Sequence, residues 1–306
     1  MKEIRVFSPN TVSNIGCGYD VLGFALEGFG DEISISKRSD SDLVIKDIHG
    51  ANLPKDSTKN VAYIAVKALL SSLRDESGFN FSIKKGIPPG SGLGSSACSS
   101  AGAVFAVNEL LGNPLTTEQL IPFAMEGERS SSGQAHADNV APSLLGGFVA
   151  IRSYNPLDIF SIPFPHQLQV VIIFPQVEVK TEYAKKILPQ KISLSDGIQQ
   201  WGNMAGLISG LMSNDFDRIG RSLHDSVAEP VRKVLIPHYD EVKEKALGNG
   251  AIGFNISGSG PATFALTNNS QSAQKIKEAC HQIYEKSGIK VMSFISPISS
   301  KGACVL

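Results

Sequence analysis

Apolar and polar residues alternate in several short stretches of the chain, and turn-forming residues separate these stretches. In 79–84 the apolar positions are Phe79, Phe81 and Ile83, which is the two-residue period of a strand with one buried face. The same alternation at 31–36 and 43–48 predicts antiparallel strands. Alternating or continuous apolar runs also predict strands at 3–8, 148–154, 168–174, 250–256, 262–266, 290–295 and 303–306.

Helical spacing of apolar residues predicts helices between these strands. They are expected at 60–73, 97–111, 116–128, 195–212, 215–223 and 270–287. Asn60 is a candidate N-cap, and Thr116 with Gln119 has the pattern of a capping box. Helices placed between antiparallel-looking strands indicate an α+β fold.

The chain has 306 residues, which is long enough for two domains. Turn residues at 155–158 form the best boundary, so we expect an N-terminal domain of residues 1–156 and a C-terminal domain of residues 157–306. The formal net charge of −1 argues against a nucleic-acid-binding surface.

Cysteine spacing and hydropathy bear on the compartment. Four scattered cysteines show neither zinc-ligand spacing nor a disulfide framework, as expected in a reducing cytoplasm. No apolar run is long enough to span a bilayer, and residues 1–6 do not resemble a signal peptide. We therefore expect a cytoplasmic protein with no membrane partner.

A glycine-rich segment, 88–97, joins the predicted strand at 79–84 to the next helix. Alternating glycines let the backbone approach a ligand closely, and the first N–H groups of a helix attract anions such as phosphate. No lysine follows the glycines, so this is no Walker A loop, and backbone dipoles, hydroxyls and a metal ion must meet the phosphate charge. The alternatives are an ordinary Gly/Ser turn and a loose dinucleotide fingerprint.

Three other polar segments have both a structural and a functional interpretation. Segment 8–20 is either a loop that caps its own backbone or a substrate loop in which Asp20 faces a cation and Asn14 forms hydrogen bonds. Segment 126–142 gathers carboxylates, a histidine, an amide and hydroxyls beside apolar residues, which a solvated loop explains less easily. Segment 257–261 is a Gly/Ser hairpin by composition.

These segments resemble the GHMP kinases, which phosphorylate small alcohols and acids with ATP. The sequence Pro-x-Gly-Ser-Gly-Leu-Gly-Ser-Ser-Ala at 88–97 is similar to their phosphate loop. The second motif, ending in His-x-Asp-Asn-Val-Ala-Pro at 136–142, has the form found in the homoserine kinases. The resemblance covers nearly the whole chain. It implies a two-domain GHMP kinase fold, with an N-terminal ribosomal protein S5 domain 2-like part and a C-terminal ferredoxin-like α/β sandwich.

The resemblance also implies a nucleotide site. Glu128, assisted by Ser96, is the expected Mg²⁺ ligand, and Asn60 is expected near the adenine base of ATP. The remaining residues that the resemblance places at the phosphates are Pro89, Gly90, Ser91, Gly92, Leu93, Gly94, Ser95, Ser96, Ala97, Cys98 and Ser99.

By the same resemblance, the acceptor is L-homoserine. Asn14 and Asp20 would hold its ammonium group, and Gly258 belongs to a glycine loop that reaches the site. Thr181 and Lys185 match a Thr-x-x-x-Arg pattern in which the Arg binds the carboxylate. Lys185 replaces a planar fork with a point charge, so the substitution is not neutral.

Four further residues have implied roles in the reaction. Arg232, a surface cation by its own sequence context, would also meet the carboxylate. His136 and Asn139 would lie beside the accepting hydroxyl. Asp138 is the candidate base, and the alternative is direct proton transfer to a phosphate oxygen.

The expected activity is that of an ATP-dependent small-molecule kinase acting on homoserine. The alternatives are another GHMP kinase, such as one of the mevalonate type, and a non-catalytic relative that serves as a binding module. Members of the family are often dimeric, so a homodimer is one expected assembly.

Overall fold

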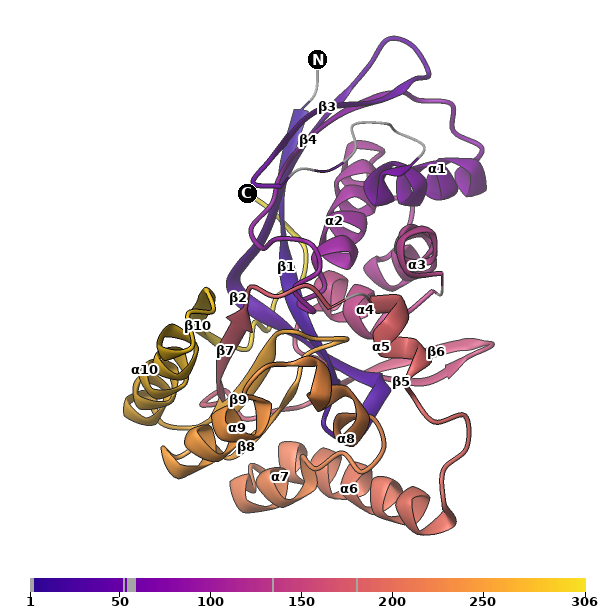
Figure 1. The fold of residues 1–306 in the computed structure, drawn as a ribbon. Coiled ribbons are helices and arrows are strands. Elements are labelled where there is room, and N and C mark those ends of the chain that lie inside the picture. The colour runs from indigo at the N-terminus through magenta and orange to yellow at the C-terminus, as the bar shows by residue number, and fades with distance from the viewer. Residues whose placement is uncertain (1–2, 52, 54–58, 134, 180) are drawn as a thin grey trace.

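The protein, seen here as a computed structural model, contains two β-sheets with helices packed on them (Figure 1). The structure describes residues 3–51, 53, 59–133, 135–179 and 181–306, and the side chains of 131, 132, 181 and 182 also lie outside this description.

The larger sheet has seven strands in the described part of the chain. Its order is β11-β1-β2-β4-β3, and β2 also pairs with β5, which pairs with β6. The strands are β1 (Glu3–Ile15), β2 (Gly18–Lys37), β3 (Leu43–His49), β4 (Phe79–Lys84), β5 (Phe148–Tyr154), β6 (Leu157–Ile162) and β11 (Cys304–Val305).

Four helices cover one face of this sheet (Figure 1). They are α1 (Val61–Leu73), α2 (Ser95–Leu110), α3 (Thr117–Ser132) and α4 (Ala137–Leu145). Fully buried side chains such as Ile33, Phe81 and Val104 fill the space between helices and sheet. Burial of that apolar surface is the main force that holds this layer together.

The smaller sheet is antiparallel in the order β10-β7-β9-β8. Its strands are β7 (Gln169–Pro175), β8 (Gly253–Ile256), β9 (Thr263–Thr267) and β10 (Val291–Pro297). Helices α9 (Tyr239–Gly248) and α10 (Ser270–Lys286) pack on one face. The other face packs on the ends of β1 and β2 and on α6 (Leu194–Ser213) and α7 (Phe216–Ser222).

Most predicted elements are confirmed. Strand β4 has the predicted bounds, Asn60 caps α1 by accepting from the Ala62 N–H, and Thr116 with Gln119 forms the capping box of α3. The predicted helix at 215–223 corresponds to α7, and α6 begins one residue earlier than predicted and ends one residue later.

Two predictions about the N-terminal part were wrong. Segment 8–20 is not a loop: β1 runs to Ile15 and β2 starts at Gly18, and bulges at Pro9/Thr11 and Ser13/Ile15 accommodate its turn-forming residues. Strand β3 is parallel to β4, not antiparallel. The crossover through α1 permits that pairing, since parallel strands need a long connection.

The chain does not leave the larger sheet at the predicted boundary. Residues 155 and 156 form the turn of the β5–β6 hairpin, so this sheet continues to Ile162. Its last strand, β11, returns from the far end of the chain to pair with β1.

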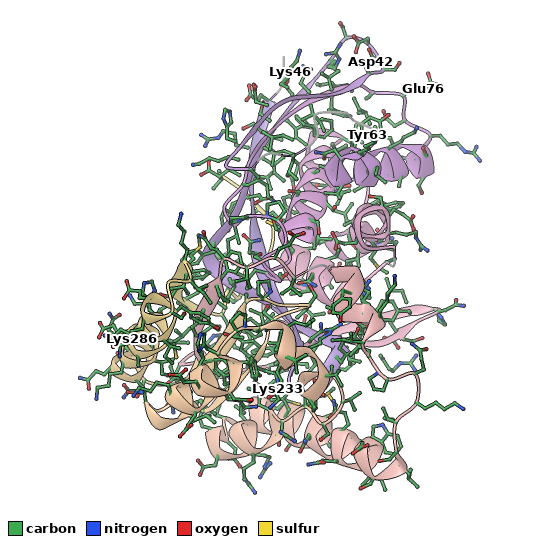
Figure 2. All side chains as sticks on the ribbon, viewed as in Figure 1. Asp42, Lys46, Tyr63, Glu76, Lys233 and Lys286 are labelled. Carbon is green, nitrogen blue, oxygen red and sulfur yellow. The ribbon has the colours of Figure 1, made fainter. Side chains whose placement is uncertain are left out.

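Charged side chains such as Lys46, Glu76 and Lys286 project from the outside of the molecule (Figure 2). Among the described residues, no helix has both the length and the apolar character needed to cross a bilayer.

Candidate active site

A cavity of about 370 Å³ lies where the two sheets and their helices meet. Its walls come from the tip of the β1–β2 hairpin, the loop before α2, the starts of α1 and α4, and the loop between β8 and β9. Two short helices complete it: α5 (Thr181–Lys186) contributes Lys185, and α8 (Glu229–Arg232) contributes Arg232.

The glycine-rich loop forms one wall of the cavity. Helix α2, which follows the loop, has no side-chain cap at its N-terminus. Gly94 is the N-cap of α2 and provides no side-chain hydrogen bond, so the first N–H groups of this helix are available to an anion. Gly92 has φ of +85°, and a Cβ there would lie 2.5 Å from the Ser257 carbonyl oxygen. Only glycine fits this close contact between the two loops.

Loop residues divide between the cavity and the core. Those that line the cavity are Pro89, Gly90, Ser91, Gly92, Gly94, Ser95, Ser96 and Ser99, and Asn60 joins them from α1. Leu93, Ala97 and Cys98 are fully buried in the core, so their side chains do not face the cavity. Leu93 lies in the loop itself, and Ala97 and Cys98 lie in the first turn of α2.

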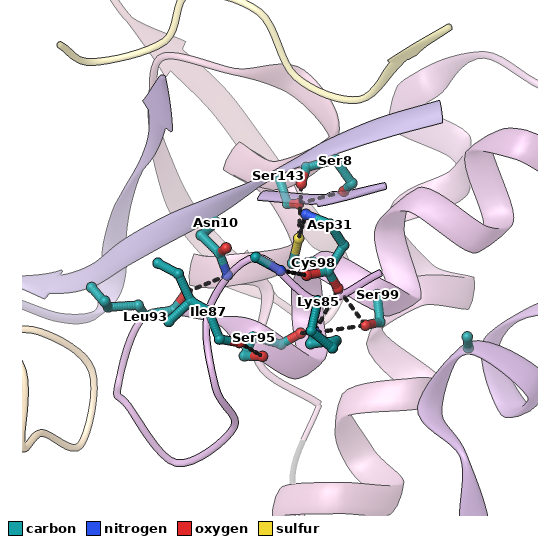
Figure 3. Close-up of polar contacts among 12 residues, drawn as sticks. Ser8, Asn10, Asp31, Lys85, Ile87, Leu93, Ser95, Cys98, Ser99 and Ser143 are labelled. Carbon is teal, nitrogen blue, oxygen red and sulfur yellow. Dashed lines mark hydrogen bonds and ion pairs between the residues drawn. The ribbon is translucent and has the colours of Figure 1, made fainter. Parts of the chain in front are cut away.

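A buried ion pair that sequence analysis missed supports this loop (Figure 3). The Lys85 ammonium group donates to Asp31 Oδ2 at 2.5 Å, to the Ser95 carbonyl at 2.6 Å and to Ser99 Oγ at 2.8 Å. Asp31 also accepts from Ser99 Oγ and from the Gly86 N–H. Lys85 directly follows β4, and Ser95 is the first residue of α2. The ammonium group therefore joins the two ends of the connection between β4 and α2.

Glu128 and Ser96 lie together at the cavity wall. The Glu128 carboxyl is hydrogen-bonded to the Ser96 side chain, and burial raises its pKa. The described residues hold no group of three or more His, Cys, Asp or Glu side chains fit to bind a metal alone. One carboxylate and one hydroxyl beside a phosphate loop do fit Mg²⁺, which commonly takes its other ligands from phosphates and water.

Asp138 and Asp20 are two carboxylates that line the cavity. Asp138 is 2% exposed, and its Oδ1 has no hydrogen-bond partner among the described residues. Burial, reinforced by the charge of Asp20, raises the pKa of Asp138 to about 6. A buried carboxylate oxygen without a protein partner is the kind of group that a ligand cation satisfies.

His136 contacts both Asp20 and Lys185. Its Nδ1 lies 3.3 Å from Asp20 Oδ1, and its Nε2 lies 3.0 Å from Lys185 Nζ. Burial acts to lower the pKa of His136, but Asp20 and Asp138 outweigh it, and the pKa is raised overall. Burial lowers the pKa of Lys185. The contact with Lys185 is a hydrogen bond when Nε2 carries no proton.

Arg232 also lines the cavity. The residue is 3% exposed, and its guanidinium donates to the carbonyls of Ala184 and Gly258. It also donates to the Tyr19 hydroxyl at 3.3 Å and lies 4.9 Å from the centre of that ring. The prediction that Arg232 by its own context is a surface cation was therefore wrong, because Tyr19 and Gly258 enclose it.

The amides Asn14 and Asn139 hold the cavity walls together. Asn14 donates to the Gly258 carbonyl at 2.9 Å and accepts from the Asp20 N–H at 2.8 Å. Asn139 accepts from Thr11 Oγ1 and donates to Ser13 Oγ, both at 2.8 Å. Both side chains line the cavity, and these hydrogen bonds fix their orientation.

The predicted substrate and catalytic residues otherwise gather in this one cavity. Those that line it are Asn14, Asp20, Glu128, His136, Asp138, Asn139, Lys185, Arg232 and Gly258. The side chain of Thr181 lies outside the described residues. Sequence analysis missed Lys85, Ser13 and Tyr19, whose local patterns are those of a strand end and a hairpin tip.

The raised pKa of Asp138 predicts how stability depends on pH. The folded state holds this proton up to about pH 6 and the unfolded chain only to about 3.8, so stability is lost as pH rises through that window. Asp138→Asn should therefore raise the free energy of unfolding by on the order of 2 kcal/mol at about pH 8 and by less at about pH 5. Urea unfolding at both values measures this; equal effects at the two would contradict the assignment.

Comparison with known proteins identifies the fold. The GHMP kinases N terminal domain matches residues 60–147, and the GHMP kinases C terminal domain matches residues 207–286. Homoserine kinase of Chlorobaculum tepidum is 43% identical over all of this chain and 99% of its own. That of Pyrococcus abyssi is 40% identical over 95% of this chain and 96% of its own.

Solved structures agree with this relationship. The crystal structure of homoserine kinase from Cytophaga hutchinsonii superposes with a TM-score of 0.97 at 46% identity, covering 100% of this chain and 98% of that one. Mevalonate kinase of L. major shares the fold alone, with a TM-score of 0.71 at 15% identity over 97% of this chain and 96% of that one. The chain belongs to the GHMP kinase family and, within it, to the homoserine kinases.

Proposed function

We propose that this protein is a homoserine kinase, which transfers the γ-phosphoryl group of ATP to the hydroxyl of L-homoserine and yields O-phospho-L-homoserine, a step of threonine biosynthesis. One observation supports the substrate: the cavity is lined both by the carboxylates of Asp20 and Asp138 and by the cations Arg232 and Lys185. An amino acid carries an ammonium and a carboxylate group, so it matches both kinds of lining charge.

The described side chains divide the work of binding. Asp20 and Asp138 face the ammonium group, and the unpartnered Asp138 oxygen accepts from it. Arg232 and Lys185 face the carboxylate. Asn139 and His136, which line the same cavity, would then lie beside the hydroxyl.

Phosphoryl transfer needs positioning and charge stabilisation more than covalent help. The N–H groups at the start of α2 hold the phosphates of ATP. Glu128 and Ser96 would hold Mg²⁺, which would neutralise negative charge on the phosphates. The homoserine oxygen forms the new bond to phosphorus and its proton passes to a phosphate oxygen, while the bond to the β,γ-bridging oxygen breaks and ADP leaves.

Turnover on a panel of acceptors tests the assignment. ADP release measured with homoserine, mevalonate and galactose should show turnover on homoserine alone, because the other two have no ammonium group for Asp20 and Asp138. Turnover only on mevalonate would favour the other GHMP kinase activity. Nucleotide binding without turnover on any acceptor would favour a binding module.

Lys185→Met should raise KM for homoserine by about 10- to 100-fold, the usual range for loss of one charge-assisted hydrogen bond. KM for ATP should change little, because Lys185 contacts His136, which we place beside the acceptor hydroxyl. The exposed neighbour Lys186, which does not line the cavity, offers the matched control Lys186→Met. Lys185→Arg should keep a low KM; equal KM values in wild type and Lys185→Met would remove Lys185 from the carboxylate site.

A further inference from the structure

The hydroxyl of Tyr154, on β5, connects two segments that carry residues of the cavity. It donates to the Asp20 carbonyl at 3.0 Å and accepts from the Ala137 N–H at 3.3 Å. Burial raises the pKa of Tyr154, so the hydroxyl keeps its proton and remains a donor. Tyr154 is not among the described residues that line the cavity. Any effect of this side chain on a substrate must therefore pass through its neighbours.

Asp20 lies where the regular pairing of β2 is interrupted. The pairing of β2 with β1 breaks between Gly18 and Gly23, and its pairing with β5 begins at Leu22. The backbone of Asp20 also has φ of +56°, a left-handed conformation that is uncommon for a residue with a side chain. Such a conformation persists only where the surrounding structure holds it in place.

Two side chains hold the backbone of Asp20 from opposite directions. Asn14 Oδ1 accepts from its N–H at 2.8 Å, and the Tyr154 hydroxyl donates to its carbonyl. Because both peptide groups that flank the Asp20 Cα are fixed, the direction of the side chain is fixed as well. The carboxylate is thereby kept 3.3 Å from His136 Nδ1.

The same hydroxyl supports the start of α4. His136 is the N-cap of this helix and provides no side-chain hydrogen bond to it. The first N–H groups of a helix need a partner from outside the helix, and Tyr154 supplies one for Ala137. Asp138 is the next residue of that first turn. One hydroxyl thus holds the segment that carries Asp20 against the segment that carries His136 and Asp138.

We propose that Tyr154 is a positioning residue for the acceptor substrate. Its hydroxyl sets the separation between Asp20 and the start of α4, so the site for the ammonium group is formed before homoserine binds. The inference rests on the proposed function, which places that ammonium group at Asp20 and Asp138. A site that is formed in advance gains affinity because less ordering remains to be done on binding.

Tyr154→Phe removes the hydroxyl and keeps the ring. KM for homoserine should rise by about 3- to 10-fold, the equivalent of one neutral hydrogen bond. KM for ATP should stay unchanged, because the residues that Tyr154 holds are those that face the acceptor. Tyr63 on α1, which is partly buried and not among the described residues that line the cavity, offers the matched control Tyr63→Phe (Figure 2). The control should leave KM for homoserine unchanged.

A double variant tests whether Tyr154 acts through Asp20. Asp20→Asn alone should raise KM for homoserine by more than Tyr154→Phe does, because it removes the charge itself. Addition of Tyr154→Phe to Asp20→Asn should then raise KM little further, since the position of an uncharged side chain matters less. Residues that act through one contact are not additive, whereas independent ones are. A double variant whose KM rises by the product of the two single effects would overturn the proposal.

NMR titration of His136 in the protein without substrate tests the same contact independently of the acceptor. Burial lowers the pKa of His136, but the charges of Asp20 and Asp138 outweigh burial and the opposing charge of Lys185. Tyr154→Phe should lower this pKa, because Asp20 can then move away from the ring, and His136→Gln assigns the signal. An unchanged pKa together with an unchanged KM for homoserine would overturn the proposal. If Asp20→Asn left KM for homoserine unchanged, the binding role of Asp20 in the proposed function would fail, while a lowered His136 pKa would still show that Tyr154 holds Asp20.

Discussion

Replacement of Glu128 by Gln is expected to lower kcat by about 10²- to 10³-fold, the loss typical of removing one group that stabilises charge in a transition state. Gln keeps the size of the side chain but removes the negative charge that a metal ion requires. Steady-state turnover at increasing Mg²⁺ concentrations measures the effect, and half-saturation should move to a higher Mg²⁺ concentration in the variant.

Stability separates this effect from damage to the fold. Burial raises the pKa of Glu128, so its charge destabilises the folded protein, and the variant should unfold at the same urea concentration as wild type or a higher one. Glu126, on the same helix and with a side chain 43% exposed, offers the matched control Glu126→Gln. Unchanged turnover or an unchanged Mg²⁺ requirement in Glu128→Gln would remove Glu128 from the metal site.

Local sequence patterns were sufficient for the elements that frame the phosphate loop. The alternation of Phe79, Phe81 and Ile83 lies directly beside the glycines, so strand, loop and helix follow within one short stretch. Segment 8–20 was harder, because its Asn, Ser and Gly residues favour turns. Asn10 is instead fully buried in β1, where it donates to the Leu93 carbonyl. A polar residue in a buried strand becomes intelligible only with its partner from another segment.

The need for partners from distant segments also explains which site residues could be predicted from the sequence. Asp20, His136 and Lys185 were named from motifs, but their contact joins three segments that are far apart in the sequence. Lys85 has no such motif and stands beside the exposed Lys84, so its local pattern is that of a surface lysine. Its burial depends on Asp31, 54 positions earlier, which no local pattern reveals.

Lys85→Met is expected to lower the free energy of unfolding by on the order of 3–5 kcal/mol, because it leaves the Asp31 carboxylate buried without its counter-charge. The Lys85 side chain is 1% exposed and that of Asp31 is fully buried, so water cannot replace the lost partner. The variant also loses the hydrogen bond that joins Lys85 to the Ser95 carbonyl. We expect KM for ATP to rise by about tenfold or more, since a small displacement of binding groups is costly. Urea unfolding and the KM values of both substrates measure the two effects.

The double variant Asp31→Asn/Lys85→Met separates the two roles of Lys85. Removal of both charges leaves no buried charge uncompensated, so stability should recover by several kcal/mol relative to Lys85→Met. KM for ATP should remain high, because nothing in the double variant donates to the Ser95 carbonyl in place of Lys85. Lys84→Met, which breaks an ion pair with Glu32 on the exposed surface, is the matched control and should change stability by less than about 1 kcal/mol. Recovery of ATP affinity together with stability would show that Lys85 acts on the fold alone and does not hold the loop.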